Sequence, residues 1–182
     1  MKYLIASDLH GSLHSVKRLL EIFDAGQYDR LVLLGDFSNY GPRNSVPADL
    51  DAATIVELLN ARASQIIAVR GNCDSEVDQM LFRFDMMRDY TFITTPEHKV
   101  IFLTHGHIYN ADRRPGLGID ALLYGHTHIW KCERQPDGLV ICNPGSPTFP
   151  KGGNPPTYAT LENGILRVHN FNDDSLIRQC AL

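Results

Sequence analysis

The chain has 182 residues, a net charge of −4 and no block of Lys and Arg, which argues against a non-specific nucleic-acid or membrane-surface binder. Hydrophobic residues make up 43% and charged residues 21%, so we expect one soluble globular domain, residues 1–182, with a full hydrophobic core. The four scattered cysteines form no C-x-x-C pair, and no apolar run approaches the ~20 residues of a membrane span. We therefore expect reduced thiols, no membrane partner and a cytoplasmic location.

The first half of the chain repeats one unit three times: an apolar strand, a turn with glycine and a polar side chain, then a helix. This order is typical of an α/β fold with a parallel sheet, in which ligands bind at the carboxyl ends of the strands. Strands are predicted over 2–7, 30–34 and 66–69, and they end at Asp8 and His10, at Asp36, and at Asn72.

The predicted helices begin at residues suited to N-caps. Ser12 precedes apolar residues at helical spacing, and a second helix is expected over 51–63. Ser75 is placed to cap a short helix carrying Val77, Met80 and Leu81. We interpret the region 80–87 as helix and core filling rather than as a cofactor site.

The second half is mostly β. Its strands again end in histidines, because His105 and His107 follow one strand and His126 and His128 follow another. Residues 110–118 are polar and glycine-bearing, which predicts a surface loop. The predicted strands are 92–95, 100–103 and 121–124, a hairpin of 129–134 with 139–142, a hairpin of 158–161 with 165–170 through an Asn-Gly turn, and 175–180. Two packed mixed sheets with helices outside accommodate this order.

Polar side chains from scattered segments add up to one candidate metal centre. Carboxylate, imidazole and amide donors without thiolate suit Mn²⁺, Fe²⁺ or Zn²⁺ rather than a cysteine-bound structural zinc. The set is too large for one open catalytic ion, and it suits two ions ~3.5–4 Å apart that share a carboxylate. Asp36 stands alone at its strand end and is the natural bridge. The set is Asp8, His10, Asp36, Asn72, His105, His126 and His128.

Each of these residues alone has an ordinary structural explanation. An Asp-x-His or a Gly-Asp at a strand end is more often a cap or a turn, and Gly-Asn is usually a turn. Their joint occurrence carries the metal prediction. His14, His98 and His169 lack such support, and we interpret them as solvated or structural.

Five ordered motifs, D-L-H, G-D-F, G-N-C-D, T-H-G-H and G-H-T-H, resemble the signature of calcineurin-like metallophosphoesterases. The flanks SDLHGS, RGNCDSEVDQM and NPGSPTFPKGGNP resemble most the small, single-domain bacterial phosphodiesterases of the YfcE type. The resemblance covers nearly the whole chain. It implies a four-layer α/β/β/α sandwich, two packed mixed β-sheets flanked by helices. It assigns Asp8, His10, Asp36 and His128 to one ion, and Asp36, Asn72, His105 and His126 to the other.

The resemblance implies a phosphodiesterase in which a water or hydroxide activated by two divalent ions attacks a small phosphodiester. Mn²⁺ is the favoured metal, with Fe²⁺, Zn²⁺ or Ni²⁺ as alternatives. Much of the larger family has a histidine after the metal-binding Asn, thought to protonate the leaving group, where this chain has Cys73. We therefore expect either a dependence on good leaving groups or an acid role for His107, which is also a candidate phosphate contact.

The remaining site predictions are weaker. Asp74 is placed to orient its neighbours, and Asn39 and Arg43 are candidate substrate-binding residues, with Ser146 and Lys151 as possible neighbours.

Two other functions stay open. A protein-interaction scaffold on the same fold is one, since a eukaryotic retromer subunit has this fold and also lacks the catalytic histidine. A nuclease is disfavoured by the acidic balance and the absence of a basic groove. Base rates favour a homo-oligomer, a dimer or a tetramer.

Overall fold

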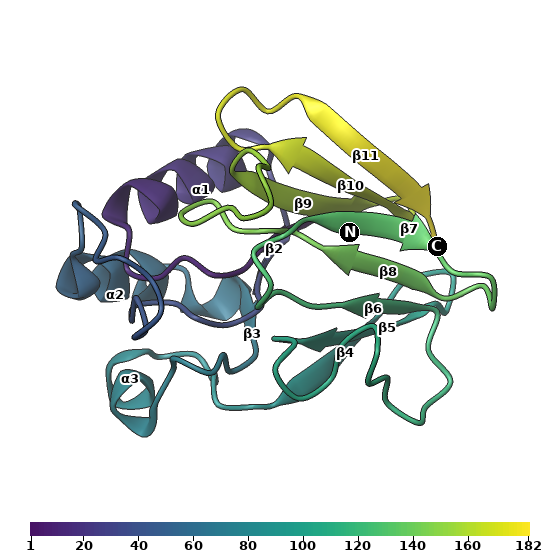
Figure 1. Cartoon of the computed structure of the whole chain (residues 1–182), viewed down its shortest axis with the longest axis horizontal. Coiled ribbons are helices and arrows are strands. Elements are labelled where there is room, and N and C mark those ends of the chain that lie inside the picture. The colour runs from purple at the N-terminus through teal and green to yellow at the C-terminus, as the bar shows by residue number, and fades with distance from the viewer.

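The computed structural model describes all residues 1–182 and contains two β-sheets packed against each other (Figure 1). The strands are β1 Tyr3–Ala6, β2 Arg30–Leu33, β3 Ile66–Ala68, β4 Tyr90–Thr94, β5 Val100–Thr104, β6 Ala121–Leu123, β7 Lys131–Arg134, β8 Val140–Asn143, β9 Thr157–Glu162, β10 Ile165–Asn170 and β11 Leu176–Ala181. The helices are α1 Leu13–Ala25, α2 Ala52–Asn60 and α3 Glu76–Leu81, with a 3₁₀ turn at Ala63–Gln65.

Each sheet contains three neighbouring parallel strands. One sheet has the order β11-β10-β9-β1-β2-β3, in which β1, β2 and β3 are parallel neighbours. The other has the order β4-β5-β6-β8-β7, in which β5, β6 and β8 are parallel. Parallel neighbours end at the same edge of a sheet, so the turns after these strands lie together, and Figure 1 shows the helices gathered on one side of the sheets.

Helices α1 and α2 cover the outer face of the six-stranded sheet. Apolar residues of α1 and α2 pack with alternate residues of β1 and β2 in one buried cluster. The other residues of those strands form a second cluster with β5, β6 and β8, which is the core between the sheets. The predicted caps at Ser12 and Ser75 are confirmed, since the Ser12 side chain accepts from the Ser15 N–H, and Ser75 forms a capping box with Asp78 at the start of α3. Asp51 also caps its helix, because its side chain accepts from the Thr54 N–H at the start of α2.

The predicted fold class, two packed mixed sheets flanked by helices, is confirmed. The outer layer over the five-stranded sheet is a loop rather than a helix. Tyr109, Ala111 and Ile119 pack onto an apolar cluster that contains Phe102 and Leu122. Both predicted hairpins form, as β7 with β8 and β9 with β10.

One packing prediction was wrong. Met86 is fully buried, but Met80 is 84% exposed, and Val77 and Leu81 of α3 are exposed as well. The reason is that α3 has only six residues, and Phe82 and Phe84 beyond it supply the packing against the core. Among the chain's helices, none is long and apolar enough to cross a membrane.

Candidate metal centre

Most of the predicted ligands have a backbone with positive φ. Asp8, His10, Asp36, His126 and His128 have φ values of 58°, 49°, 56°, 66° and 59°. Residues with a Cβ rarely adopt this left-handed region, and such strain concentrates at functional sites. These residues lie just after β1, β2 and β6, where tight turns aim their side chains into one shared space.

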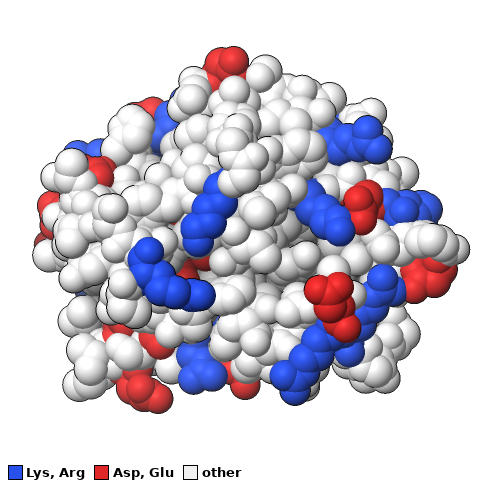
Figure 2. Space-filling model, viewed as in Figure 1, with Lys and Arg blue, Asp and Glu red and all other residues white.

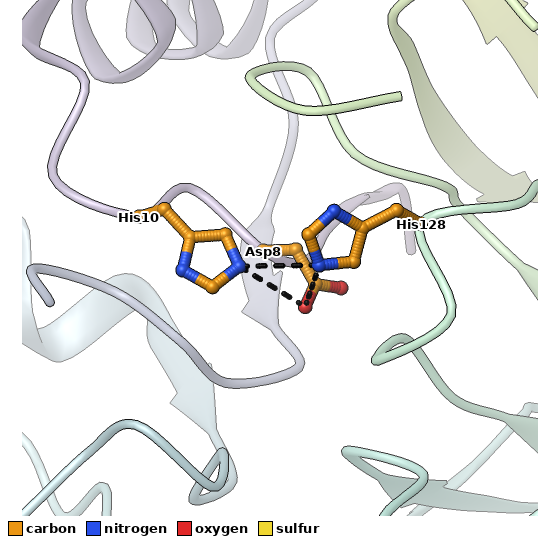
Figure 3. A group of neighbouring side chains, drawn as sticks. All are labelled: Asp8, His10 and His128. Carbon is orange, nitrogen blue, oxygen red and sulfur yellow. Dashed lines mark hydrogen bonds and ion pairs between the residues drawn. The ribbon is translucent and has the colours of Figure 1, made fainter. Parts of the chain in front are cut away.

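Three side chains form a first group (Figure 3). The Nε2 atoms of His10 and His128 are 3.2 Å apart. Asp8 Oδ1 lies 3.3 Å from His128 Nε2 and 3.6 Å from His10 Nε2. Asp36 joins the group from β2, because its Oδ2 lies 3.7 Å from His10 Nε2.

A second group lies on the other side of Asp36. The same Oδ2 atom of Asp36 lies 3.5 Å from His105 Nε2. His105 Nε2 is in turn 3.1 Å from Asn72 Oδ1 and 3.2 Å from His126 Nδ1. The structure therefore brings together all seven predicted ligands, with one carboxylate oxygen of Asp36 between two sets of donors.

Backbone carbonyls fix the orientation of three imidazoles. The Nδ1 atoms of His10, His105 and His128 lie 2.9, 2.7 and 2.7 Å from the carbonyl oxygens of Asn39, Leu34 and Phe149. A carbonyl only accepts, so each Nδ1 donates its proton there and each ring turns its Nε2 atom inward. This is the usual arrangement of metal-bound histidines.

The donor set fits a cation. Asp8 Oδ1 is fully buried and accepts no hydrogen bond. Burial works against its charge, but His10 and His128 hold the pKa of Asp8 well below its usual range. Burial and the neighbouring His105 lower the pKa of His126 to about 4, so its ring is neutral at pH 7. Two imidazole nitrogens 3.2 Å apart, with the Asp8 carboxylate oxygen beside them, form a donor set of the kind that divalent cations take.

Asp74 holds two of the ligand-bearing turns together. Its buried carboxylate accepts from the backbone N–H groups of Asp36, Phe37 and Gly71 at 2.8, 2.9 and 2.7 Å. Burial and the neighbouring charge of Asp36 raise the pKa of Asp74 to about 6. Asp74 thus touches the loops that carry Asp36 and Asn72 rather than the centre itself.

Cys73 and His107 occupy different surroundings. Cys73 lines the cleft over the centre, its N–H donates to Asp36 Oδ1 at 2.8 Å, and burial and Asp36 raise the pKa of the thiol to about 12. The His107 ring lies 5.4 Å from the ring of His105, but it does not line the cleft. Burial, followed by the charge of His105, lowers the pKa of His107.

The cleft wall contains Arg43 but not Asn39. Asn39 instead accepts from His10 Nδ1 through its carbonyl, and its side chain accepts from the Gly41 N–H at 2.9 Å. Two neighbours of the centre were not predicted from the sequence. Asn44 Nδ2 lies 3.5 Å from His10 Nε2, and the Phe149 carbonyl accepts from His128 Nδ1, a backbone contact that no side-chain pattern reveals. The cleft is lined by His10, Asp36, Gly41, Pro42, Arg43, Asn44, Asn72, Cys73, His126, His128 and Lys151.

Comparison with known proteins adds independent findings. A family model described as the calcineurin-like phosphoesterase superfamily domain matches residues 1–164. Phosphodiesterase YfcE of Escherichia coli K12 is 45% identical over 183 residues, which cover 100% of this chain and 98% of that protein. Phosphodiesterase MJ0936 of Methanocaldococcus jannaschii is 30% identical over 154 residues, which cover 80% of this chain and 83% of that protein.

Solved structures agree with this. The structure of the E. coli phosphoesterase Yfce matches with a TM-score of 0.95 at 45% identity, over 100% of this chain and 99% of that one. Vps29 of Entamoeba histolytica, solved in complex with Zn²⁺, matches with a TM-score of 0.63 at 20% identity, over 100% and 99% of the two chains. At 20% identity, the match to Vps29 supports the fold and says nothing about function.

Proposed function

Because the chain belongs to the calcineurin-like phosphoesterase superfamily, we propose that it is a metal-dependent phosphodiesterase acting on a small phosphodiester. The membership confirms the predicted family and the predicted class of enzyme, a phosphoesterase. The preference for a diester is supported by two relatives, both named phosphodiesterases, at 45% and 30% identity.

One observation supports a centre of two ions above all others: Asp36 Oδ2 lies between two sets of donors, at 3.7 Å from His10 Nε2 and 3.5 Å from His105 Nε2. In our proposal Asp36 is shared by both ions. The first would be held also by Asp8, His10 and His128, and the second also by Asn72, His105 and His126.

When bound, two divalent ions would supply an activated water for attack on phosphorus and would offset charge on the phosphoryl oxygens. The chain's own residues prepare the site for this chemistry. The carbonyls of Asn39, Leu34 and Phe149 hold three imidazoles with their Nε2 atoms inward, so little reorganisation accompanies binding. Asp74 positions the turn that carries Asp36.

Substrate contacts are proposed for the residues that line the cleft. Arg43 is exposed at the mouth, where a guanidinium can pair with an anionic group of the substrate. Cys73 lines the cleft and occupies the position, directly after Asn72, at which much of the larger family has a histidine. A thiol is a weak hydrogen-bond donor, so we propose that this chain favours diesters with good leaving groups. His107 remains the alternative acid.

The test is hydrolysis of bis-p-nitrophenyl phosphate by protein stripped of metal and then reloaded with Mn²⁺, with Fe²⁺, Zn²⁺ and Ni²⁺ in parallel. We expect activity with metal and none with chelator. Asp36→Asn should reduce the rate at least about a hundredfold, because it weakens both sets of donors at once. Asp112→Asn removes an exposed carboxylate outside the cleft and serves as the matched control.

Elemental analysis of the same samples separates the two leading functions. Two metals per chain with hydrolysis support the enzyme. Two metals per chain without hydrolysis of any diester would favour the interaction scaffold. Failure to bind any divalent metal would remove both ion assignments.

A further inference from the structure

The segment 146–154, with the sequence SPTFPKGGN, is hydrogen-bonded to the loops of the candidate metal centre. Ser146 Oγ donates to the carbonyl of Asp8 at 2.8 Å, and Thr148 Oγ1 donates to the carbonyl of Leu9 at 2.8 Å. Ser146 is fully buried, so this end of the segment is fixed against the turn after β1. We call the segment 146–154 the clasp.

The clasp is also hydrogen-bonded to the loop after β6. The Phe149 carbonyl accepts from His128 Nδ1 at 2.7 Å, and the Phe149 ring lies 5.6 Å from the His10 ring. The Lys151 N–H then donates to the carbonyl of His128 at 3.0 Å. The backbone of Lys151 is therefore tied directly to a predicted metal ligand.

A tight turn holds Lys151 at the mouth of the cleft. Gly152 and Gly153 follow with φ of 69° and 74°, and Asn154 Nδ2 donates to the Lys151 carbonyl at 2.8 Å. Lys151 lines the cleft, is exposed, and makes no ion pair with any acidic side chain of the chain.

Arg43 stands on a second braced loop at the same cleft. Asn44 Nδ2 donates to the Tyr40 carbonyl at 2.7 Å, and the Gly41 N–H donates to Asn39 Oδ1 at 2.9 Å. The Arg43 guanidinium is exposed and, like the Lys151 ammonium, forms no ion pair or hydrogen bond within the chain. Figure 2 shows basic side chains on both sides of a hollow in this face, with acidic atoms visible between them.

The charges around the cleft exceed what one diester needs. A phosphodiester carries one negative charge, and the two ions of the proposed centre would already offset that charge. Asp36 is the one acidic residue of the cleft wall, and Pro42 is its one apolar residue. Two cations without acidic partners in an otherwise polar wall are complementary to a further anion.

We propose that Lys151 and Arg43 bind a second anionic group, a carboxylate or a phosphate, which the substrate carries beside its scissile diester. This inference rests on the proposed function and refines its substrate class. Lys151 is the specificity-determining residue, because the clasp fixes it relative to His128, and Arg43 assists from the opposite loop.

The kinetic test uses p-nitrophenyl diesters with one leaving group and four second arms: ethyl, 2-carboxyethyl, 2-phosphoethyl and choline. We expect kcat/KM to rank anionic above neutral above cationic arms. One ion pair at about 4 Å in a high dielectric is worth about a fivefold preference. The preference should shrink as salt is added. The carboxyl and phosphate arms distinguish the two sources of the anion.

The variants are Lys151→Gln and Lys151→Arg, with Lys17→Gln, an exposed lysine of α1 outside the cleft, as the control for overall charge. Lys151→Gln should reduce the ratio of anionic-arm to neutral-arm kcat/KM about fivefold, and Lys151→Arg should retain it. The measured quantity is a ratio within each variant, so a general loss of activity does not affect the conclusion.

A second readout needs no turnover. Calorimetric binding of 3-phosphonopropionate should be tighter than binding of propylphosphonate, and Lys151→Gln should remove the difference. Equal responses to all arms, or a ratio unchanged in Lys151→Gln, would overturn the inference while leaving the phosphodiesterase intact. Absence of hydrolysis of every diester by the wild type would instead refute the proposed function.

Discussion

Gly125→Ala is a sharp test of how the metal-ligand loops are packed. A Cβ added at Gly125 would lie 1.8 Å from Ser7 Oγ, 2.6 Å from Ser7 Cβ and 2.7 Å from Asp8 Oδ2. All three distances are below ordinary contact, so the end of β1 and the loop after β6 have to separate. Gly125 does not have a positive φ. Glycine is therefore required here because a Cβ has no room, and not because of the backbone conformation.

The cost can be worked from the contacts that separation breaks. Overpacking of this kind costs about 1–3 kcal/mol. Ser7 Oγ donates to the Leu34 carbonyl at 3.2 Å, and the His126 N–H donates to Asp8 Oδ2 at 2.9 Å. Losing one neutral and one charge-assisted hydrogen bond adds about 1 and about 2 kcal/mol. We expect Gly125→Ala to lower the free energy of unfolding by about 4–6 kcal/mol and to reduce metal occupancy.

The assay is urea unfolding of metal-free protein, with metal content measured on reloaded samples. Ser7→Gly removes two of the three close contacts, so we expect Ser7→Gly with Gly125→Ala to show a favourable coupling of about 2 kcal/mol. Gly116→Ala is the matched control, because no atom lies within 4 Å of its added Cβ. If the effects of Ser7→Gly and Gly125→Ala simply add, the close approach of the two loops is not the reason for glycine.

Four further predictions follow from the site and the core. Asp36→Asn should lower bound metal from two ions per chain to one or none by elemental analysis, whereas loss of activity with both ions retained would contradict a shared ligand. Cys73→His should raise kcat for alkyl diesters more than for aryl diesters in a paired rate comparison, and an equal effect would refute the leaving-group argument. Asp74→Ala leaves three buried N–H groups without their acceptor and should destabilise the protein by at least about 3 kcal/mol in urea, while a change below 1 kcal/mol would show that water replaces the carboxylate. Burial lowers the pKa of His169 from its ordinary value of 6.5, so the unfolded chain takes up the proton first as pH falls; the wild type should lose stability relative to His169→Gln between pH 7.5 and 5, and a constant difference would be contrary evidence.

Local sequence information was sufficient to predict that these side chains converge. Asp8, Asp36 and Asn72 follow predicted parallel strands, and parallel strands bring their ends to one edge whatever the details of packing. The caps at Ser12 and Ser75 and the Asn-Gly turn between β9 and β10 are equally local, because they depend on residues within a few positions.

Packing between distant segments decided the rest. The loop layer over the five-stranded sheet and the exposure of Met80 depend on which apolar faces find partners, which periodicity alone does not contain. The contact of the Asn39 carbonyl with His10 is likewise one that the sequence did not predict.

The sequence by itself determined which side chains reach the centre, because residue type and strand order are properties of the chain. Only the tertiary structure decided how they are held. Carbonyls of Leu34, Asn39 and Phe149 choose the nitrogen that each imidazole turns inward, and the clasp places Lys151 beside His128. Backbone groups from residues far apart in the chain make these contacts, and every residue type carries the same backbone carbonyl, so no pattern of side chains encodes them.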